Sequence, residues 1–462
     1  MPIKRRSIVL AGLLAGWLAG TGLVPAQAMT LEEALALTYE TNPGLLAARA
    51  QLRAIDENVS QARSAWRPTV SSTLSVGVNK TKAKASGTTT DGTSVPKTGT
   101  LSVVQALYSG GAFGAAIAGA EADVQSQRAN LFNSEQDTLL QAVVAYVNVV
   151  REEVTLDLQV NNLSRLEKQL EATRDRFRVG EVTRTDVAQA EARVSRAKSD
   201  RTQAEGNLIT ARVTFERVVG RVPDKVTVPG SPIGLPTGRD EAVDIAVREN
   251  FTLVQAKFAE LSSRHAVTEA EAGLMPTLEL VGQAQQTYDT SGGDNETTDL
   301  TAEVQLSIPI YQQGTEYSTI RQAKETANRS RLLVDDTRRS VVDSAASAFE
   351  SYQTTLAQIE SLRDEVKSSE IALEGVEQEA TVGARTVLDV LDAEQELLDG
   401  QVTLVQARRD AIVAAYQLMQ ALGRLTAQDL GLPVDIYDYD SHYVEVSGKL
   451  WGTTPSGRMP GN

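Results

Sequence analysis

The chain has 462 residues and a formal net charge of −15, and it contains no cysteine. The lack of cysteine excludes disulfides, thiol catalysis, thiolate metal sites and a cysteine-anchored lipoprotein start. A chain this acidic is not expected to bind nucleic acid.

Residues 1–28 predict an export signal. Basic residues at positions 4–6 precede an apolar run over 8–24, and Ala26-Gln27-Ala28 forms a small-x-small cleavage site. The alternative is a retained membrane anchor. The rest of the chain carries a net charge of −18 and has no second run of 18 apolar residues. It therefore predicts no transmembrane helix, but both a soluble periplasmic protein and membrane-spanning strands remain open.

The remaining sequence contains two copies of one pattern. Gly180 returns as Gly383 with an offset of 203, whereas Asn42 returns as Asn250 with an offset of 208. The repeats occupy residues 29–229 and 230–429. The first copy therefore has about five more residues between Pro68 and Tyr108 than the second has between Pro276 and Tyr311. Insertions usually lie in loops, so a longer loop is expected there.

Each copy is predicted to open with one helix. In the first copy Thr30 and Glu33 form a capping-box pattern, and the helix should end before Pro68. The second helix should run from about 240 to the residue before Pro276.

Two β-hairpins should follow the prolines, at about 69–108 and 277–311. Apolar and polar residues alternate in both, most regularly from Asp299 to Ile310, and polar tracts at 80–97 and 289–298 predict the loops. About ten residues suit a tilted membrane-spanning strand, although a small soluble antiparallel sheet remains an alternative. Four strands cannot close a barrel, so spanning strands would need several chains, and a trimer would supply twelve.

Long helical hairpins are predicted at about 112–219 and 314–423. Their first helices, near 111–178 and 314–380, contain no proline and would each be roughly 100 Å long. Apolar residues recur every seven positions, which indicates a coiled-coil contact. They are Leu156, Leu163 and Leu170 in the first copy and Ile359, Val366 and Leu373 in the second. Gly180 and Gly383 should occupy the positive-φ position that ends a helix.

Segments rich in proline and glycine lie at 222–238 and 430–451, each after a returning helix. We expect both at the same height, as a collar around the middle of the shaft. Residues 452–462 should be disordered.

Candidate functional residues gather at the hairpin turns. Asp389 and Asp392 are three residues apart and therefore share one helix face. They would either be a solvated acidic face or caps at the helix N-terminus, or the two carboxylates would form one functional site. The arginines of the first turn would complement the helix C-terminus or form a docking surface; they are Arg174, Arg176, Arg178 and Arg184. His265 and His442 lie in no metal or catalytic pattern, so we assign a role to neither. No catalytic constellation or phosphate loop is present, and no enzyme activity or cofactor is predicted.

From residue 29 to about 435 the chain resembles the TolC family of outer membrane factors. The resemblance rests on the repeat, on the turn from Val382 to Ala393, on residues 307–314 and on Pro276-Thr277-Leu278. It implies a mainly α fold with a β-barrel portion: a homotrimer with a twelve-stranded outer-membrane barrel, a periplasmic α-barrel of coiled-coil hairpins and a small mixed collar.

The resemblance also implies a function. The trimer would be the passive exit duct of tripartite efflux pumps or type I secretion systems, in contact with outer membrane lipid. Its partners would be a periplasmic adaptor and an inner-membrane transporter of the RND, ABC or MFS type. The alternative is a periplasmic or surface coiled-coil interaction protein without a pore.

The resemblance assigns roles at the turns. Asp389 and Asp392 match constricting carboxylates, which in three copies would form rings with raised pKa values that attract a multivalent cation. Arg385 matches a gate arginine. Gly180, Gly383, Arg178 and Arg184 would dock the adaptor.

The partners of Arg385 would be Asp175, Thr185 and Asp186. Asp175 stands where the family has glutamine, which permits an Arg385–Asp175 ion pair. Ala380 replaces the family's gate tyrosine, so the link from that tyrosine to Asp186 is lost. We therefore hypothesise that Arg385 contributes more to closure here.

Overall fold

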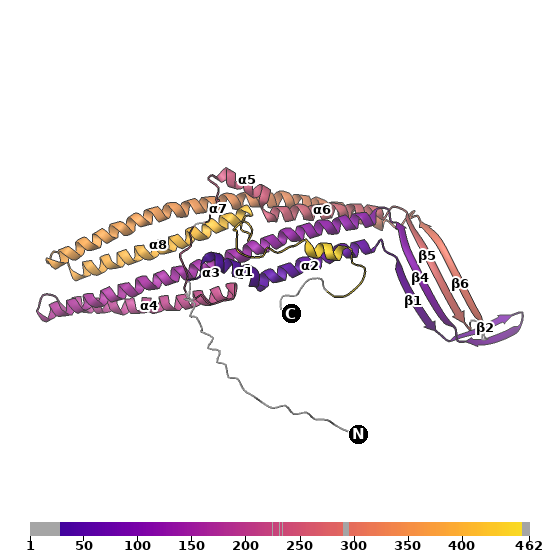
Figure 1. The fold of residues 1–462 in the computed structure, drawn as a ribbon, viewed down its shortest axis with the longest axis horizontal. Coiled ribbons are helices and arrows are strands. Elements are labelled where there is room, and N and C mark those ends of the chain that lie inside the picture. The colour runs from indigo at the N-terminus through magenta and orange to yellow at the C-terminus, as the bar shows by residue number, and fades with distance from the viewer. Residues whose placement is uncertain (1–27, 224, 231, 233, 290–294, 455–462) are drawn as a thin grey trace, which may run out of the picture.

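A computed structural model describes residues 28–223, 225–230, 232, 234–289 and 295–454. Helices extend along most of the molecule and the strands lie at one end (Figure 1). The helices are α1 Leu31–Thr41, α2 Pro43–Ser64, α3 Ala112–Arg178, α4 Arg184–Val219, α5 Arg239–Glu249, α6 Phe251–Ala272, α7 Thr315–Thr381, α8 Val387–Leu422 and α9 Ser441–Ser447. The strands are β1 Thr69–Val76, β2 Asn79–Ala85, β3 Thr88–Ser94, β4 Lys97–Tyr108, β5 Thr277–Tyr288 and β6 Glu296–Ser307.

The prediction of a single opening helix in each copy is wrong, because an asparagine divides it. Asn42 ends α1 in an extended conformation and its side chain caps α2, while Asn250 does the same between α5 and α6. Each side-chain amide also donates to a carbonyl at the end of a returning helix, Asn42 to Val218 at 3.0 Å and Asn250 to Ala421 at 2.9 Å. The break therefore attaches the opening helices to the middle of the shaft.

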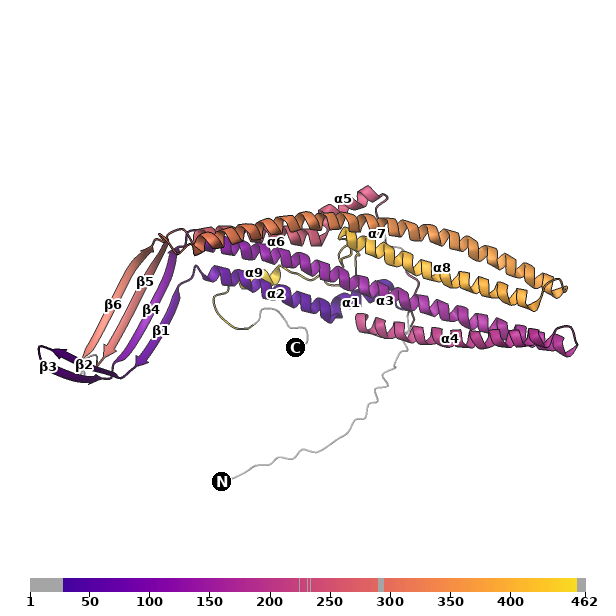
Figure 2. The same cartoon turned by 180° about the vertical axis from the view of Figure 1, so that it is seen from behind.

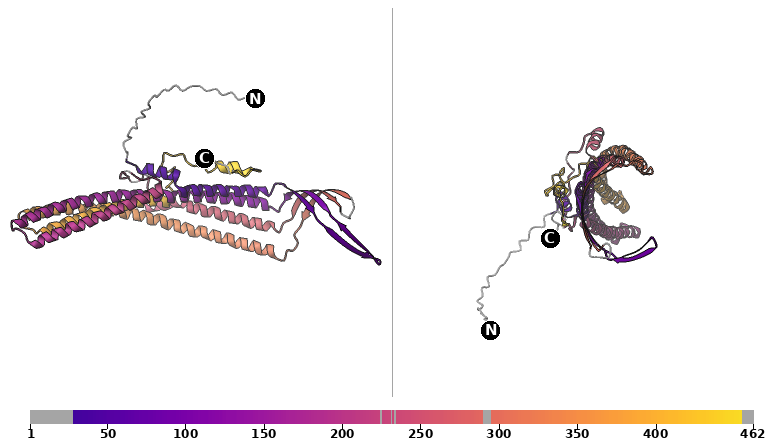
Figure 3. Two further views of the ribbon diagram at one scale, coloured as in Figure 1. Left: turned by 90° about the horizontal axis from the view of Figure 1, so that it is seen from below. Right: turned by 90° about the vertical axis from the view of Figure 1, so that its right-hand side faces the viewer.

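The long helical hairpins are confirmed. The descending helices α3 and α7 have 67 residues each, and the returning helices α4 and α8 have 36 each. The seven-residue repeat lies inside: Leu163, Leu170, Ile359 and Leu373 are all buried. Seen along its length, the chain forms an arc with α9 on the convex side (Figure 3). None of the described helices has an apolar stretch long enough to cross a bilayer.

Four antiparallel strands form one sheet in the order β1-β4-β5-β6. Their register brings the apolar residues of all four strands to the same face, since Val70 is opposite Val103, Leu101 is opposite Ala284, and Ala284 is opposite Leu300. The other face carries mostly serine, threonine, glutamine and charged side chains. Within one chain the sheet is open, because β1 and β6 each have an unpaired edge.

The prediction of a loop at 80–97 is wrong over most of that range. The range contains a second, two-stranded sheet of β2 and β3, which projects beyond the far end of the main sheet (Figure 2). Ser86 and Gly87 turn between these strands with positive φ values of 47° and 88°. The second loop is shorter than predicted, since β6 already begins at Glu296, and β6 ends at Ser307 rather than near 311.

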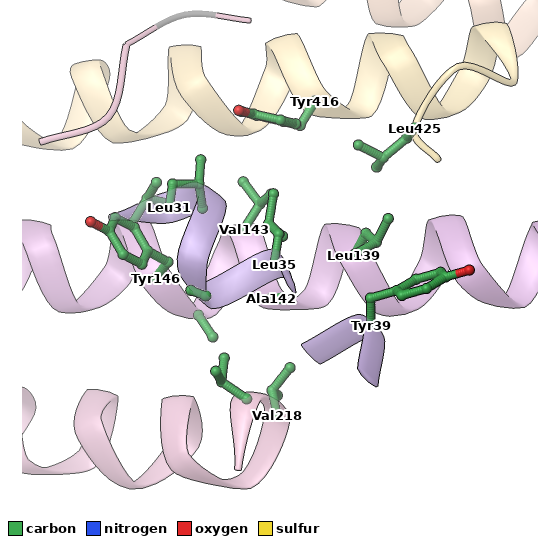
Figure 4. Close-up of a cluster of buried hydrophobic side chains, with 14 of the residues drawn as sticks. Leu31, Leu35, Tyr39, Leu139, Ala142, Val143, Tyr146, Val218, Tyr416 and Leu425 are labelled. Carbon is green, nitrogen blue, oxygen red and sulfur yellow. The ribbon is translucent and has the colours of Figure 1, made fainter. Parts of the chain in front are cut away.

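The largest apolar core lies where the opening helices meet the hairpins. Side chains from α1, α3, α4 and α8 converge there, among them Leu35, Tyr146, Val218 and Tyr416 (Figure 4). The Tyr146 hydroxyl lies 2.8 Å from the carbonyl oxygens of Met29 and Thr227. It thereby ties the start of the described chain to the linker between the repeats.

Both predicted collar segments contribute to this region, but the expectation that all of 430–451 lies at one height is wrong from α9 onward. Helix α9 packs along α2, and the carbonyl of Lys449 reaches Arg67 close to the sheet. Leu235 from the linker, and Leu432, Val434 and Tyr437 after α8, pack against the core. The predicted signal segment lies almost entirely outside the described residues, as do positions 455–462 of the predicted disordered tail.

Candidate functional site at the hairpin tips

The two Val-Gly turns lie at the end of the bundle opposite the sheet (Figure 1). Gly180 and Gly383 have φ values of +83° and +78°, as expected for a left-handed helix end. In each turn an amide reaches back five residues, from Glu181 to Arg176 and from Ala384 to Glu379, both at 2.9 Å. A Cβ atom added to either glycine would meet no atom within 4 Å. Backbone conformation, not crowding, therefore requires glycine here.

Asp186 and Asp389 cap the returning helices. Thr386 donates to Asp389 Oδ2 from its amide at 2.9 Å and from its hydroxyl at 2.8 Å, while the Asp389 amide donates to the Thr386 hydroxyl at 3.2 Å. Thr183 and Asp186 form the same capping box. The hydrogen bond from the Thr386 amide, with the others, lowers the pKa of Asp389. Within one chain this carboxylate thus has the cap role, and the raised pKa expected for a ring of three chains stays a prediction.

Asp392 has a different partner. Its Oδ1 atom lies 2.5 Å from Nη2 of Arg193, which joins α8 of the second hairpin to α4 of the first. The side chain of Arg193 is 28% exposed and that of Asp392 is 58% exposed. The sequence analysis missed Arg193. The repeat offset of 203 pairs Asp392 with position 189 of the first copy. Arg193 lies one helical turn beyond position 189, and this spacing was the signal available in the sequence.

The predicted Arg385–Asp175 ion pair does not form within the described chain. Arg385 Nε instead lies 2.8 Å from Oε2 of Glu379 in its own hairpin, and Asp175 pairs with Arg178, three residues along α3. Both pairs are exposed, where an ion pair stabilises little. A contact between Arg385 and Asp175 of neighbouring chains stays a prediction.

The remaining predicted tip residues do not form a single cluster. Arg174 lies 2.6 Å from Glu191 and so links the two helices of the first hairpin. Thr185 and Arg184 are exposed at the start of α4, and Asp186 is committed to its cap. The first turn therefore offers an exposed basic surface at its tip.

Ala380 packs inside the second hairpin. It lies against the apolar cluster of Leu373, Val390 and Leu397, close to Val376. The methyl group of Ala380 therefore contributes to apolar packing at the position where the resemblance leads one to expect a tyrosine.

Glu394 is a buried carboxylate that the sequence analysis did not identify. Its residue is 5% exposed, and within the described chain its Oε2 atom has no hydrogen-bond partner. Burial raises the pKa of Glu394 to about 6; the charge of Arg165 on α3 opposes this shift, and that of Glu377 on α7 adds to it. The equivalent residue of the first copy, Glu191, is exposed and paired with Arg174. The tip of the second hairpin therefore contains a titratable group between the two hairpins.

No group of three or more His, Cys, Asp or Glu residues that could hold a metal ion occurs in the described part of the chain. A cation at Asp389 or Asp392 would thus need carboxylates from more than one chain.

A family profile described as outer membrane efflux protein matches residues 34–221 and 242–424. The chain is 37% identical to the outer membrane efflux protein BepC of Brucella suis biovar 1 (strain 1330) over 98% of each chain. It is 26% identical to the outer membrane protein TolC of Escherichia coli (strain K12), over 89% of this chain and 87% of TolC. The CmeC outer membrane channel of Campylobacter jejuni has a similar structure, with a TM-score of 0.75 and 16% identity over 90% of this chain and 89% of CmeC, which supports the fold alone.

Proposed function

Since this chain belongs to the outer membrane efflux protein family and is an outer membrane channel protein, we propose that three copies form one exit duct with a gate at the hairpin tips. Proteins related to this chain are named for efflux and for protease secretion. The duct would be passive, with a periplasmic adaptor docked at the tips and an inner-membrane transporter supplying the energy.

The observation that carries this proposal is the open, two-faced sheet. Leu74, Leu300 and Val304 on its apolar face are 84%, 80% and 61% exposed, although such side chains are normally buried. The edges of β1 and β6 are unpaired, and unpaired edges cannot lie in lipid. Pairing β6 of one chain with β1 of the next would close twelve strands, with the apolar face toward lipid and the polar face toward the passage.

The gate would depend on contact between the two hairpins of each chain. Arg193 and Asp392 hold α4 against α8, and Leu391 of α8 is buried in one cluster with Leu163 and Leu166 of α3. Moving the second hairpin away from the first would break this ion pair and leave three Asp392 carboxylates facing the passage. An adaptor that binds the exposed basic surface at Arg178 and Arg184 could drive that movement by preferring the open arrangement.

Fractionation and bilayer recordings together test this function. We expect the protein in the outer membrane fraction and, once purified, discrete conductance steps in a planar bilayer. Recovery in the soluble periplasm alone, with no conductance, would support the coiled-coil interaction protein and overturn the duct. Crosslinking in cells should capture an adaptor with the wild type, and less of it with an Arg178→Glu, Arg184→Glu variant. The control is Arg201→Glu, on α4 with Arg184 but away from the tip.

A further inference from the structure

Helix α9 and the residues directly after it follow α2 toward the sheet. The Arg63 guanidinium donates to the carbonyl of Ser447 at 3.2 Å, and that of Arg67 donates to the carbonyl of Lys449 at 2.9 Å. Arg67 is two residues before β1. The backbone of Lys449 therefore lies at the level where the sheet begins.

This segment is held by specific buried contacts. His442 Nδ1 lies 2.9 Å from Oδ2 of Asp56, and the two side chains are only 8% and 1% exposed. Val446 is fully buried, and Arg128 lies 2.6 Å from Asp440 just before α9. The helix is therefore fixed to α2, and the residues that follow it are presented from a defined position.

Two large apolar side chains are exposed at this position. Trp451 is 86% exposed and Leu450 is 65% exposed, although they are adjacent in a segment that is otherwise anchored. The apolar face of the sheet begins at Val70, three residues after Arg67, and Val70 is 63% exposed. Helix α9 lies on the convex side of the arc, away from the enclosed passage (Figure 3).

We propose that Leu450 and Trp451 insert into the periplasmic leaflet of the outer membrane and anchor the C-terminal segment to phospholipid. The inference rests on the proposed function, which places the start of the sheet at the periplasmic membrane surface. An indole has an apolar ring and a polar N–H, and therefore prefers the headgroup level of a bilayer. The cationic side chain of Arg67 suits the phosphates there. A chain without cysteine cannot use a thioether-linked lipid for this purpose.

Tryptophan fluorescence tests the anchor directly. The chain has three tryptophans, at positions 17, 66 and 451, and position 17 lies in the predicted export signal. A Trp66→Phe variant therefore leaves Trp451 as the only tryptophan of the exported protein. The full-length trimer would be reconstituted in bilayers of phosphatidylethanolamine and phosphatidylglycerol that carry bromine at known depths of the acyl chain.

We expect the emission of Trp451 to be blue-shifted. Bromines near the headgroup should quench most of its intensity, and iodide in the water should quench it little. A Trp451→Phe variant, which reports on Trp66, is the matched control. Emission of a fully hydrated indole that iodide quenches and brominated lipid does not would overturn the anchor. Conductance recorded in the same bilayers separates the two proposals. A conducting trimer with a hydrated Trp451 would contradict only the anchor. A protein that fails to insert into the bilayer would contradict both the duct and the anchor.

Discussion

In the wild type the packing of α8 against α3 at the tip should weaken as the pH rises, and replacing Glu394 with glutamine should abolish this pH dependence. The substitution keeps the shape of the side chain and eliminates its charge. Burial raises the pKa of Glu394 from 4.5 to about 6, and a change of about 1.5 in pKa corresponds to about 2 kcal/mol per chain. Since the pKa is higher in the folded state, the stabilisation is complete below about pH 4.5 and is lost as the pH rises through about 6.

The assay is hydrogen exchange of the tip peptides in the purified trimer, at about pH 5 and about pH 8 after correction for intrinsic exchange. In the wild type the contact of α8 with α3 should open more often at the higher pH, by about 1 kcal/mol in opening free energy, because the rest of the roughly 2 kcal/mol is already lost at pH 5. In Glu394→Gln the two pH values should give the same protection. Glu191→Gln changes the exposed equivalent in the first copy and should behave like the wild type. Unchanged pH dependence in Glu394→Gln, or its loss in Glu191→Gln, would refute the reasoning.

Four further substitutions, and one double variant, test the gate and the shaft. Arg193→Ala and Asp392→Asn should each raise single-channel conductance, and the double variant should conduct about as well as either single variant, because all three lack the same ion pair. Equal conductance in these three variants and the wild type would contradict a role of this ion pair in closure. Arg385→Ser should also raise conductance if Arg385 bonds a neighbouring chain, and an unchanged conductance would exclude it from closure. Asn250→Ala removes a helix cap and the bond to Ala421, so thermal unfolding should show a loss of about 1–2 kcal/mol; no loss would mean that the division between α5 and α6 needs no cap.

Much of the fold was predictable because it depends on local periodicity. The alternation after Pro68 and Pro276 specifies strands, and the proline-free runs that follow specify long helices. The break in the opening helix was harder to predict. Pro43 marks it in the first copy, but Asn250 is followed by phenylalanine, and its bond to the Ala421 carbonyl is visible only once α8 is placed beside it.

The tip was less predictable, because the face that a side chain occupies depends on how two long helices rotate against each other. Spacing placed Asp389 and Asp392 on one face, yet one caps a helix and the other pairs with Arg193. Burial of Glu394 likewise depends on the approach of α3 to α8, far apart in sequence. The β2–β3 hairpin was missed because its strands are polar on both faces and show no apolar alternation.

Disulfide crosslinking between the edges of the sheet is the most direct test of the trimeric duct. The chain has no cysteine of its own, so one can be placed in β1 at 69, 71 or 73 and one in β6 at 303, 305 or 307. We expect at least one combination to give crosslinked chains up to a trimer on a denaturing gel under oxidation, and none with either cysteine alone. If no combination links chains, although thiol reagents label each cysteine, then β1 and β6 of neighbouring chains do not pair and the shared duct is contradicted.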